Sequence, residues 1–234
     1  MRVVSLVPSA TETLMAWGIT PVAVTRFCEQ PQLAHVGGTK DPDVDAIVAL
    51  RPDVVVMCTQ ENRLVDAEAL RAGGINVHAI DITRLGHVGP QMEALACAVE
   101  AAAPTGPWPL GDEVAPPRLR AFVPIWKRPW MTISGDTYGS SLLRALGVEN
   151  VYDNHTDRYP TVDIRDVVML RPDVVLATSE PYPFAERHRR QLEEIAPVMF
   201  IDGQDLFWWG ARTPAAMQRL RAVLESETVQ RRAK

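Results

Sequence analysis

Short apolar runs alternate with longer amphipathic segments along most of this chain. The apolar runs predict buried strands, because a strand covered on both faces of a sheet carries apolar residues at nearly every position. The longer segments begin near Ser, Thr or Asp and end at Gly or before Pro, as helices do. Strands are expected at 3–7, 22–25, 53–57, 75–80, 122–126, 173–177 and 198–201. Helices are expected at 9–17, 43–50, 64–72, 94–103, 140–146, 164–170 and 185–195, with a last one from Thr213 through Leu224.

The start of the first helix has the spacing of a capping box. Ser9 offers a hydroxyl as N-cap, and Glu12 follows three residues later. In a capping box these two side chains accept hydrogen bonds from each other's backbone amides. Ser9 is therefore expected mainly as a helix cap, although a helix N-terminus can also hold an anionic group.

Sequence blocks recur in the same order, which indicates an internal duplication. The block 50–56 returns at 170–176 with six of seven residues identical, at an offset of 120. Two shorter echoes join 13–19 with 141–148 and 80–81 with 201–202. Repeats in a fixed order predict two structural units of the same build.

Each repeat alternates strands with helices, which predicts parallel sheets. The expected fold class is α/β, with two Rossmann-like lobes whose parallel sheets flank a ligand cleft. The N-terminal lobe is expected at 1–85 and the C-terminal lobe at 119–234. Between them, 86–118 is expected to hold one inter-lobe helix and a linker, because prolines between 104 and 118 exclude a helix there.

The composition is that of an ordinary globular protein. Of the 234 residues, 47% are hydrophobic and 23% are charged, so a core can form and intrinsic disorder is excluded. A net charge of −5 argues against nucleic acid as a partner. No run approaches the roughly 20 apolar residues of a membrane span. The apolar N-terminal stretch is too short for a secretory signal, so the chain as written is expected in the cytoplasm, and in the periplasm or outside the cell if a leader was removed.

Cysteine and histidine form no dedicated metal motif. The three cysteines include no CxxC pair, and the five histidines include no HxxxH or HExxH pair. Cys28 is open to two interpretations, a small buried side chain or a thiol that contacts a metal centre. His188 belongs to no motif and is expected at the surface.

Aromatic side chains gather in the segments that follow the expected strands. Ligands of open α/β sheets bind beyond the carboxyl ends of the strands, and a two-lobed protein places them in the cleft between two such edges. Aromatic side chains there suit a broad, partly apolar ligand, although Trp126 and the Trp208-Trp209 pair could instead be core. The aromatic candidates are Phe27, Trp126, Trp130, Tyr182, Phe184, Phe207, Trp208 and Trp209.

Two acidic residues occupy equivalent places in the two repeats. Glu61 and Glu180 each follow the strand of the repeated block by a few residues. They are either solvated loop carboxylates or paired polar contacts that orient a ligand. Both interpretations stay open at this point.

Several motifs resemble those of the vitamin B12-binding, periplasmic-type substrate-binding proteins. These periplasmic-type binding proteins belong to class III, the helical-backbone group, whose members bind cobalamin, haem, siderophores or metal ions. The resemblance implies two Rossmann-like lobes joined by one rigid helix, a ligand in the cleft and no catalysis. The motifs keep the family's order over nearly the whole chain and lie at 3–12, 24–31, 45–53, 61–62, 134–138, 147–151 and 210–212.

The resemblance and the strand-end positions together select the candidate ligand-binding residues. Cobalamin or another corrinoid is the expected ligand, and Cys28 is the one candidate contact for a metal. The candidates are Ser9, Phe27, Cys28, Glu29, Glu61, Asn62, Trp126, Trp130, Asp136, Tyr138, Glu180, Tyr182, Phe184, Phe207, Trp208, Trp209 and Arg212.

The chain departs from the family pattern at specific places. The family's long backbone helix would fall in the Pro-rich stretch, so this helix is expected to be shortened. The resemblance implies that transport members present one glutamate per lobe to arginines of the permease. The matching positions in this chain are Asp45 and Arg165. An arginine would repel a basic docking pocket, which argues against docking on an ABC permease, although Asp166 is adjacent. Where the family's first lobe would place aromatics against a corrin, this chain has Gln30, Thr39 and Cys58.

Two classes of function remain. The first is non-catalytic binding of a corrinoid or similar metal chelate, as a carrier, scavenger, sensor or ABC-transporter-type substrate-binding protein. Direct binding of a metal ion, haem or a siderophore is its alternative. The second is an enzyme that has adopted this scaffold. The sequence has no nucleophile–base pair and no phosphate-binding loop of the GxGxxG or GxxxxGK[ST] type, which argues against the enzyme.

Overall fold

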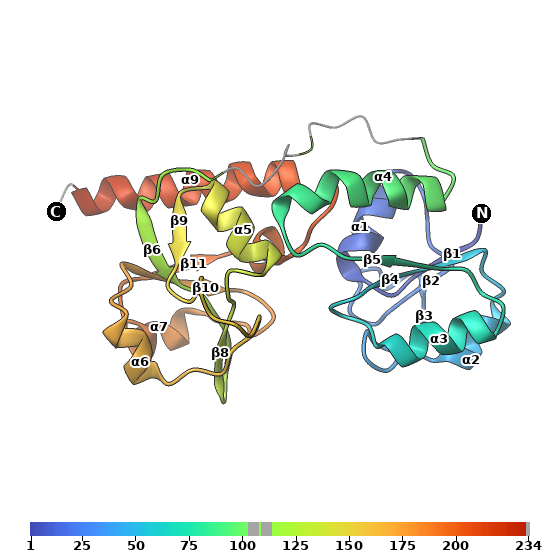
Figure 1. Ribbon diagram of the computed structural model, residues 1–234, viewed down its shortest axis with the longest axis horizontal. Helices are drawn as coiled ribbons and strands as arrows, with labels where there is room; N and C mark the ends of the chain where they lie inside the picture. Colours follow the sequence, from blue (N-terminus) through green and yellow to red (C-terminus); the bar gives the residue numbers. More distant parts are fainter. Residues whose placement is uncertain (103–107, 109–113, 233–234) are drawn as a thin grey trace. The chain divides into compact units, whose positions relative to one another are not determined.

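The computed structural model describes residues 1–102, 108 and 114–232, with side chains described up to Glu225 (Figure 1). The chain divides into two compact units. Unit 1 comprises Met1–Ile82, His87–Trp108 and Trp209–Arg212, and unit 2 comprises Thr83–Gly86, Pro109–Trp208 and Thr213–Lys234. The lobe boundaries expected at 85 and 119 stay predictions, and most of the expected linker at 104–118 lies outside the described residues.

Unit 1 is built on a parallel sheet with the strand order β3-β2-β1-β4-β5. The central strands are apolar and buried at nearly every position, because helices cover both faces of the sheet. Helices α2 and α3 lie on one face and α1 and α4 on the other (Figure 1). The strands are β1 (Val3–Ser5), β2 (Ala23–Val24), β3 (Ala34–His35), β4 (Val54–Cys58) and β5 (Val77–Ile80). The helices are α1 (Pro8–Ala16), α2 (Val44–Ala49), α3 (Leu64–Ala72) and α4 (Val88–Ala98), the last preceded by the 3-10 turn η1 (Leu85–His87).

Unit 2 combines a parallel sheet of the order β11-β10-β6-β9 with the antiparallel hairpin β7-β8. Helices α6 and α7 lie on one face of the parallel sheet and α5 and α9 on the other (Figure 1). The strands are β6 (Leu119–Phe122), β7 (Pro124–Lys127), β8 (Trp130–Thr132), β9 (Val148–Asn150), β10 (Val174–Thr178) and β11 (Val198–Ile201). The helices are α5 (Tyr138–Ala145), α6 (Ile164–Met169), the 3-10 turn η2 (Glu186–His188), α7 (Arg189–Leu192), α8 (Gly203–Phe207) and α9 (Thr213–Arg232).

The two sheets share one strand order, which confirms the predicted duplication. The order β2-β1-β4-β5 in unit 1 corresponds to β9-β6-β10-β11 in unit 2. The repeated Leu-Arg-Pro-Asp block has the same backbone in both, since Arg51 and Arg171 take left-handed φ values of 47° and 51°. The α/β fold expected from the sequence is therefore confirmed.

The repeated aspartates make the same contact in both units. Asp53 Oδ2 accepts the backbone N–H of Arg2 at 2.5 Å, and Asp173 Oδ2 accepts that of Arg120 at 2.7 Å. Each block therefore joins the start of its own strand to the start of the neighbouring central strand.

The capping box expected at Ser9 is wrong. Helix α1 begins at Pro8, and its N-cap is Val7, which has no side-chain cap. A proline at the first helical position has a suitable φ and lacks an N–H that would be unpaired there. The helix therefore starts before Ser9, which is buried inside its first turn.

The single strand expected at 122–126 is two strands. Pro124 has no N–H to donate to the parallel ladder, so the chain leaves the sheet after β6. It then forms β7, which pairs antiparallel with β8. The segment 127–130 was expected as a plain loop, but Lys127 and Trp130 pair as the ends of β7 and β8, and only Arg128-Pro129 forms the turn.

Four helices differ from expectation, and one of them is α9, which extends to Arg232 beyond the expected Leu224. Helix α4 spans Val88–Ala98 rather than 94–103, because Pro90 lies in its first turn, where proline is tolerated. The helix expected at 185–195 is only η2 and α7, which ends before Pro197. The loop expected at 205–209 is partly helix α8, whose N-cap Asp202 accepts the N–H of Gln204 at 2.8 Å. No helix in the described parts of the chain is both long and apolar enough to cross a membrane.

Candidate functional site

The predicted site residues lie mostly after the carboxyl ends of parallel strands, where open α/β sheets bind ligands. In unit 1 the segments follow β1, β2 and β4, and in unit 2 they follow β6, β10 and β11. The strand order reverses between β1 and β4 and between β6 and β10, so the loops after these strands leave in opposite directions. Each unit is described separately below.

In unit 1, Asn62 lies between the loops that follow β1 and β4. Its Oδ1 accepts the N–H of Cys58 at 2.8 Å. Its Nδ2 donates to the carbonyl oxygens of Leu6 at 3.3 Å and Thr39 at 2.9 Å. Because both amide hydrogens are engaged by backbone and the side chain is buried, Asn62 holds three strand-end segments together.

Cys28 and Cys58 are buried thiols at the same edge. Cys28 Sγ lies 3.2 Å from Thr11 Oγ1 and 3.3 Å from Thr25 Oγ1, within a buried hydroxyl cluster. Burial, and then the nearby charge of Glu61, raises the pKa of Cys58 to about 12, so its thiol stays protonated at neutral pH. Among the described residues, no group of three or more His, Cys, Asp or Glu side chains is placed to hold a metal ion. A metal contact by Cys28 stays a prediction.

Phe27 presents an aromatic ring to solvent after β2. The ring is 53% exposed, and the guanidinium of Arg26 lies 4.9 Å from its centroid. Arg26 is in turn held by an ion pair with Asp41 at 3.0 Å. The Phe27 ring is thus an exposed apolar surface in unit 1, and the Arg26 guanidinium packs on it in a cation–π interaction. Glu29, two residues further on, is also exposed.

Arg212 is anchored to helix α1 within unit 1. Its guanidinium donates to both carboxylate oxygens of Glu12, at 2.7 Å to Oε1 and 2.9 Å to Oε2. The N–H of Ala211 donates to Thr13 Oγ1 at 3.1 Å. Gly210 takes a φ of 103°, and an added Cβ there would meet Thr13 Oγ1, so this turn requires glycine. Arg212 is therefore held in one orientation by α1.

Unit 2 carries an aromatic cluster, which we define as Trp126, Trp130, Tyr182, Phe184 and His188. Trp130 stacks on Phe184 with centroids 6.0 Å apart and planes at 5°. Trp126 meets Tyr182 edge-on at 5.6 Å, and Tyr182 meets Phe184 at 4.7 Å. Hairpin residues and the segment after β10 thereby form one apolar wall, of which Trp126 is 44% exposed.

His188 is buried inside this cluster at 7% exposure, so its expected place at the surface is wrong. The N–H of Ala185 donates to its Nδ1 at 3.1 Å, and its Nε2 lies 3.5 Å from Tyr182 Oη. Burial, followed by the positive charges of Arg187 and Lys127, lowers the pKa of His188. The imidazole is therefore neutral at neutral pH. Sequence alone gave no signal for this packing because His188 follows no motif.

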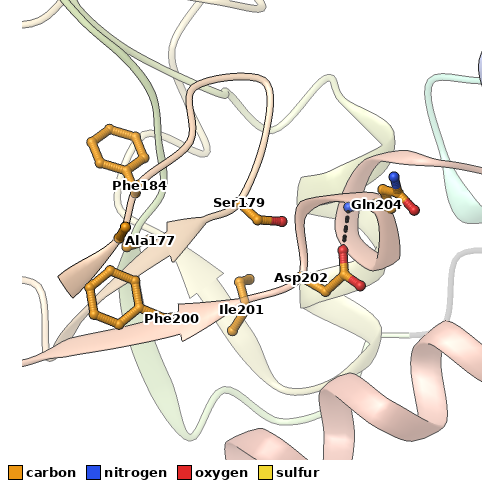
Figure 2. A pocket seen from close by; sticks show the side chains of 8 residues that line it. Ala177, Ser179, Phe184, Phe200, Ile201, Asp202 and Gln204 are labelled. Atoms are coloured by element: carbon orange, nitrogen blue, oxygen red, sulfur yellow. Dashed lines mark hydrogen bonds between the residues drawn. The ribbon is translucent and has the colours of Figure 1, made fainter. Parts of the chain in front are cut away.

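A cavity of about 570 Å³ lies in unit 2 beside the aromatic cluster (Figure 2). Phe184 and Phe200 line one part of it, and polar Ser179 and Asp202 lie at the strand ends. An apolar cavity with a few polar groups is the usual form of a small-molecule site. The lining residues are Ala177, Ser179, Phe184, Ala185, Phe200, Ile201, Asp202 and Gln204.

Glu180 lies in a segment that α8 approaches closely. A Cβ on Gly203 would lie 2.6 Å from the backbone N and the Cγ of Glu180, so only glycine permits this approach. Gly203 N–H also donates to Ser179 Oγ at 2.9 Å. Glu180 and Glu61 follow the equivalent strands β10 and β4, and both are half-buried.

The remaining candidates differ widely in exposure. Asp136 is exposed and paired with Arg158 at 2.7 Å. Tyr138 is buried, its Oη lies 3.0 Å from Thr213 Oγ1, and burial raises its pKa above the usual range. Phe207 packs against Gly139, where a Cβ would come within 3.2 Å of the ring. In the Trp pair, Trp208 is half-buried and Trp209 is buried.

A second cavity, of about 430 Å³, lies elsewhere in unit 2. Its lining includes the carboxylates of Asp163 and Asp166 beside the aromatic ring of Tyr152. Burial, then the charges of Asp166 and Asp163, raises the pKa of Tyr152. No sequence pattern predicted this cavity, whose lining comes from the segment before α6 and from α6 and its C-terminal end. They are Tyr152, His155, Thr161, Val162, Asp163, Asp166, Met169 and Leu170.

The fold and its strand-end residues agree with a known class of proteins. Residues 3–103 match the family model described as a periplasmic binding protein. The match covers less than half of the chain, and over these residues the chain resembles the class of the periplasmic-type binding proteins.

Within that class, the chain is similar to vitamin B12-binding proteins. It is 26% identical to that of Vibrio vulnificus (strain CMCP6) in an alignment of 199 positions that covers 76% of this chain and 71% of the relative. The crystal structure of the periplasmic vitamin B12-binding protein of Vibrio cholerae has the same fold, with a TM-score of 0.77, 20% identity and 96% of each chain covered. The periplasmic heme-binding protein HutB of Vibrio cholerae gives a TM-score of 0.73, with 19% identity and 96% and 98% of the two chains covered. These comparisons confirm the resemblance to the B12-binding-protein-like periplasmic binding proteins.

Proposed function

We propose that the protein binds cobalamin or a related corrinoid without transforming it, as a carrier of the substrate-binding type. The observation that carries this proposal is the similarity to vitamin B12-binding proteins over 76% of the chain. Exposed aromatic side chains at the strand ends support it, because a corrin is broad, planar and partly apolar. The proposed contacts are those selected from the sequence, among which Phe27 and Trp126 have the most exposed rings.

A titration with cyanocobalamin tests the proposal. Binding should quench tryptophan fluorescence and perturb the corrin absorption bands. Trp126→Ala should weaken binding about fivefold, because an aromatic contact contributes roughly 1 kcal/mol. Tyr159→Ala is the control, since this aromatic is equally exposed at 44% but lies outside the aromatic cluster. No response to about 50 μM cyanocobalamin would overturn the proposal.

Haem is the second candidate ligand. The structural similarity to HutB favours it, because that protein is described as heme-binding and shares the fold. A parallel titration with hemin separates the two ligands. Tighter binding of hemin than of cyanocobalamin, with a Soret band that shifts in the complex, would replace cobalamin by haem in this proposal.

We propose that the bound ligand leaves the protein unchanged. The relatives are described as binding proteins, which supports a role without catalysis. Ligand recovered after prolonged incubation should have the absorption spectrum and chromatographic mobility of the starting material. A new product that accumulates with turnover would show an enzyme.

We propose further that the carrier does not dock on a permease through one acidic residue per lobe. Asp45 and Arg165 lie in the first turns of the equivalent helices α2 and α6, and both are exposed. A positive charge at Arg165 opposes a basic docking pocket. Ligand-loaded protein should not stimulate a vitamin B12 permease in proteoliposomes, whereas Arg165→Glu should gain stimulation. Strong stimulation by the unmodified protein would contradict this part of the proposal.

A further inference from the structure

His188 supports the wall that the aromatic cluster shares with the cavity. Phe184 and Ala185 line the cavity, and both contact His188. The ring of Phe184 meets His188 edge-on at 5.6 Å, and the ring of Tyr182 meets it at 5.5 Å. A change at His188 therefore alters its contacts with the rings of Phe184 and Tyr182 and with the backbone N–H of Ala185.

We propose that neutral His188 is the positioning residue of this wall and that its protonation weakens ligand binding in acid. The inference rests on the proposed function, because it takes the wall to be part of the ligand site. His188 acts through Phe184 and Tyr182 and is itself buried.

Hydrogen-bond chemistry gives the direction of the effect. Since Ala185 N–H donates to Nδ1 at 3.1 Å, this nitrogen must carry a lone pair and the proton of the neutral ring must lie on Nε2. Nε2–H then faces Tyr182 Oη at 3.5 Å. In the imidazolium, Nδ1 becomes a donor and opposes the N–H of Ala185. The segment 182–185 then loses one of the hydrogen bonds that hold it, while the Phe184 N–H still donates to the carbonyl oxygen of Thr178 at 3.2 Å.

The charges around His188 also disfavour the imidazolium. Lys127 of β7 and Arg187 of η2 are both positive. Glu186, on the same turn as His188, is bound by Arg189 at 2.5 Å. Glu193 of the following turn is bound by Arg189 as well, at 3.4 Å. The folded protein therefore takes up this proton only at a pH below the ordinary value for histidine, near 6.5.

Binding of cyanocobalamin at pH 7.5 and pH 5.0 tests the proposal. The affinity of the unmodified protein should be lower at pH 5.0, by less than the roughly thirtyfold that the ordinary histidine pKa near 6.5 would give, because only the fraction with neutral His188 is competent to bind. His188→Gln keeps an acceptor for Ala185 and a donor for Tyr182 but does not titrate, so its affinity should change less than about twofold. His155→Gln is the matched control. His155 Nδ1 also accepts a backbone N–H, from Asp157, but this ring is exposed and lies outside the aromatic cluster.

The same acid-dependent fall in His188→Gln as in the unmodified protein would overturn the proposal. A loss of this pH dependence in His155→Gln, with retention in His188→Gln, would overturn it too. If His188→Gln does not fold, long-range ¹H–¹⁵N NMR of the unmodified free protein decides the question. A proton on Nε2 at pH 7.5, with acid shifts of the Trp126 and Trp130 indole signals that follow His188, supports it, and a proton on Nδ1 overturns it.

Failure of the proposed function has a different signature. A chain that binds no cyanocobalamin at either pH overturns that function and the acid-sensitive binding with it. The NMR measurement on the free protein still decides whether His188 positions the wall. The two results are therefore separable.

Discussion

At the scale of single residues, the three cysteines differ in how far solvent reaches their thiols. Cys28 and Cys58 are buried, whereas Cys97 is exposed on α4. The pKa of Cys58 is raised to about 12, so its reactive thiolate is scarce at any physiological pH. One thiol per native chain should react quickly with an aromatic disulfide reagent at pH 8, and three should react in denaturant. Rapid reaction of a second thiol in the native protein would contradict the burial of Cys28 and Cys58.

His78 gives a second prediction at this scale. Within the described part of the chain, its Nε2 is buried without a hydrogen-bond partner, and burial lowers its pKa. The unfolded chain therefore binds a proton near pH 6.5 that the folded chain resists, so the free energy of unfolding falls as the pH drops below about 6.5. His78→Leu should remove this loss and raise the free energy of unfolding by about 1 kcal/mol at neutral pH.

Urea unfolding at pH 7.5 and pH 5.5 measures both effects of His78→Leu. The lowered pKa of His188 also makes the free energy of unfolding fall in acid, so His78→Leu should keep part of the dependence of stability on pH. His35→Leu is a suitable control, because this histidine is exposed. An unchanged acid dependence in His78→Leu would show that His78 takes no part in it.

At the scale of elements, the repeated block makes a prediction that compares the two units. Asp53 and Asp173 each accept the backbone N–H at the start of a central strand, from Arg2 and Arg120. Replacement of either aspartate by alanine should cost about 1 kcal/mol, because each removes one charge-assisted hydrogen bond near the surface. Asp53→Asn and Asp173→Asn keep the acceptor and should cost less. Calorimetric unfolding measures these differences, and unequal costs beyond a factor of about two would argue that the two blocks are not equivalent.

Elements with a single dominant signal could be predicted closely from sequence. Helix 64–72 and strand 198–201 have the expected bounds, since one ends at a Gly pair and the other is an uninterrupted apolar run. Where an element differs from the prediction, the difference depends on a single residue whose role is set by the residues packed around it. Pro124 ends a parallel strand and also begins an antiparallel one, and Asp202 caps a helix in a segment whose aromatic content suggested a loop. Pattern alone does not distinguish these roles, because each depends on tertiary pairing.

At the scale of the whole molecule, the duplication was visible in sequence and the packing within the site was not. Three blocks that recur in the same order predicted two units, and the longest of them has the same backbone in both, with left-handed φ values at Arg51 and Arg171. Four aromatic candidates of unit 2 lie together, namely Trp126, Trp130, Tyr182 and Phe184. His188 could not be predicted, because its place depends on the rings of Tyr182 and Phe184. These two rings pack in turn on Trp126 and Trp130 of a hairpin that the pattern merged into one strand.

The C-terminal part of the chain offers the last prediction. Trp209–Arg212 belongs to unit 1, whereas the residues before and after belong to unit 2. The paired hydrogen bonds from Arg212 to Glu12 hold this segment on α1, and both side chains are mostly shielded, with exposures of 16% and 33%. A double-mutant cycle of Glu12→Ala and Arg212→Ala should give a coupling of about 1–2 kcal/mol in the free energy of unfolding.

The same variants distinguish an anchor from a ligand contact at Arg212. If Arg212 only anchors the segment, both single variants should lower stability alike and leave cyanocobalamin affinity within about twofold. If Arg212 also contacts the ligand, as the sequence predicts, Arg212→Ala should weaken binding by much more than Glu12→Ala, which keeps the guanidinium. Arg212→Lys serves as the control for charge, because it keeps the cation but loses the paired donor geometry. A coupling near zero would contradict the anchor itself and leave the Arg212 guanidinium assigned to the ligand alone.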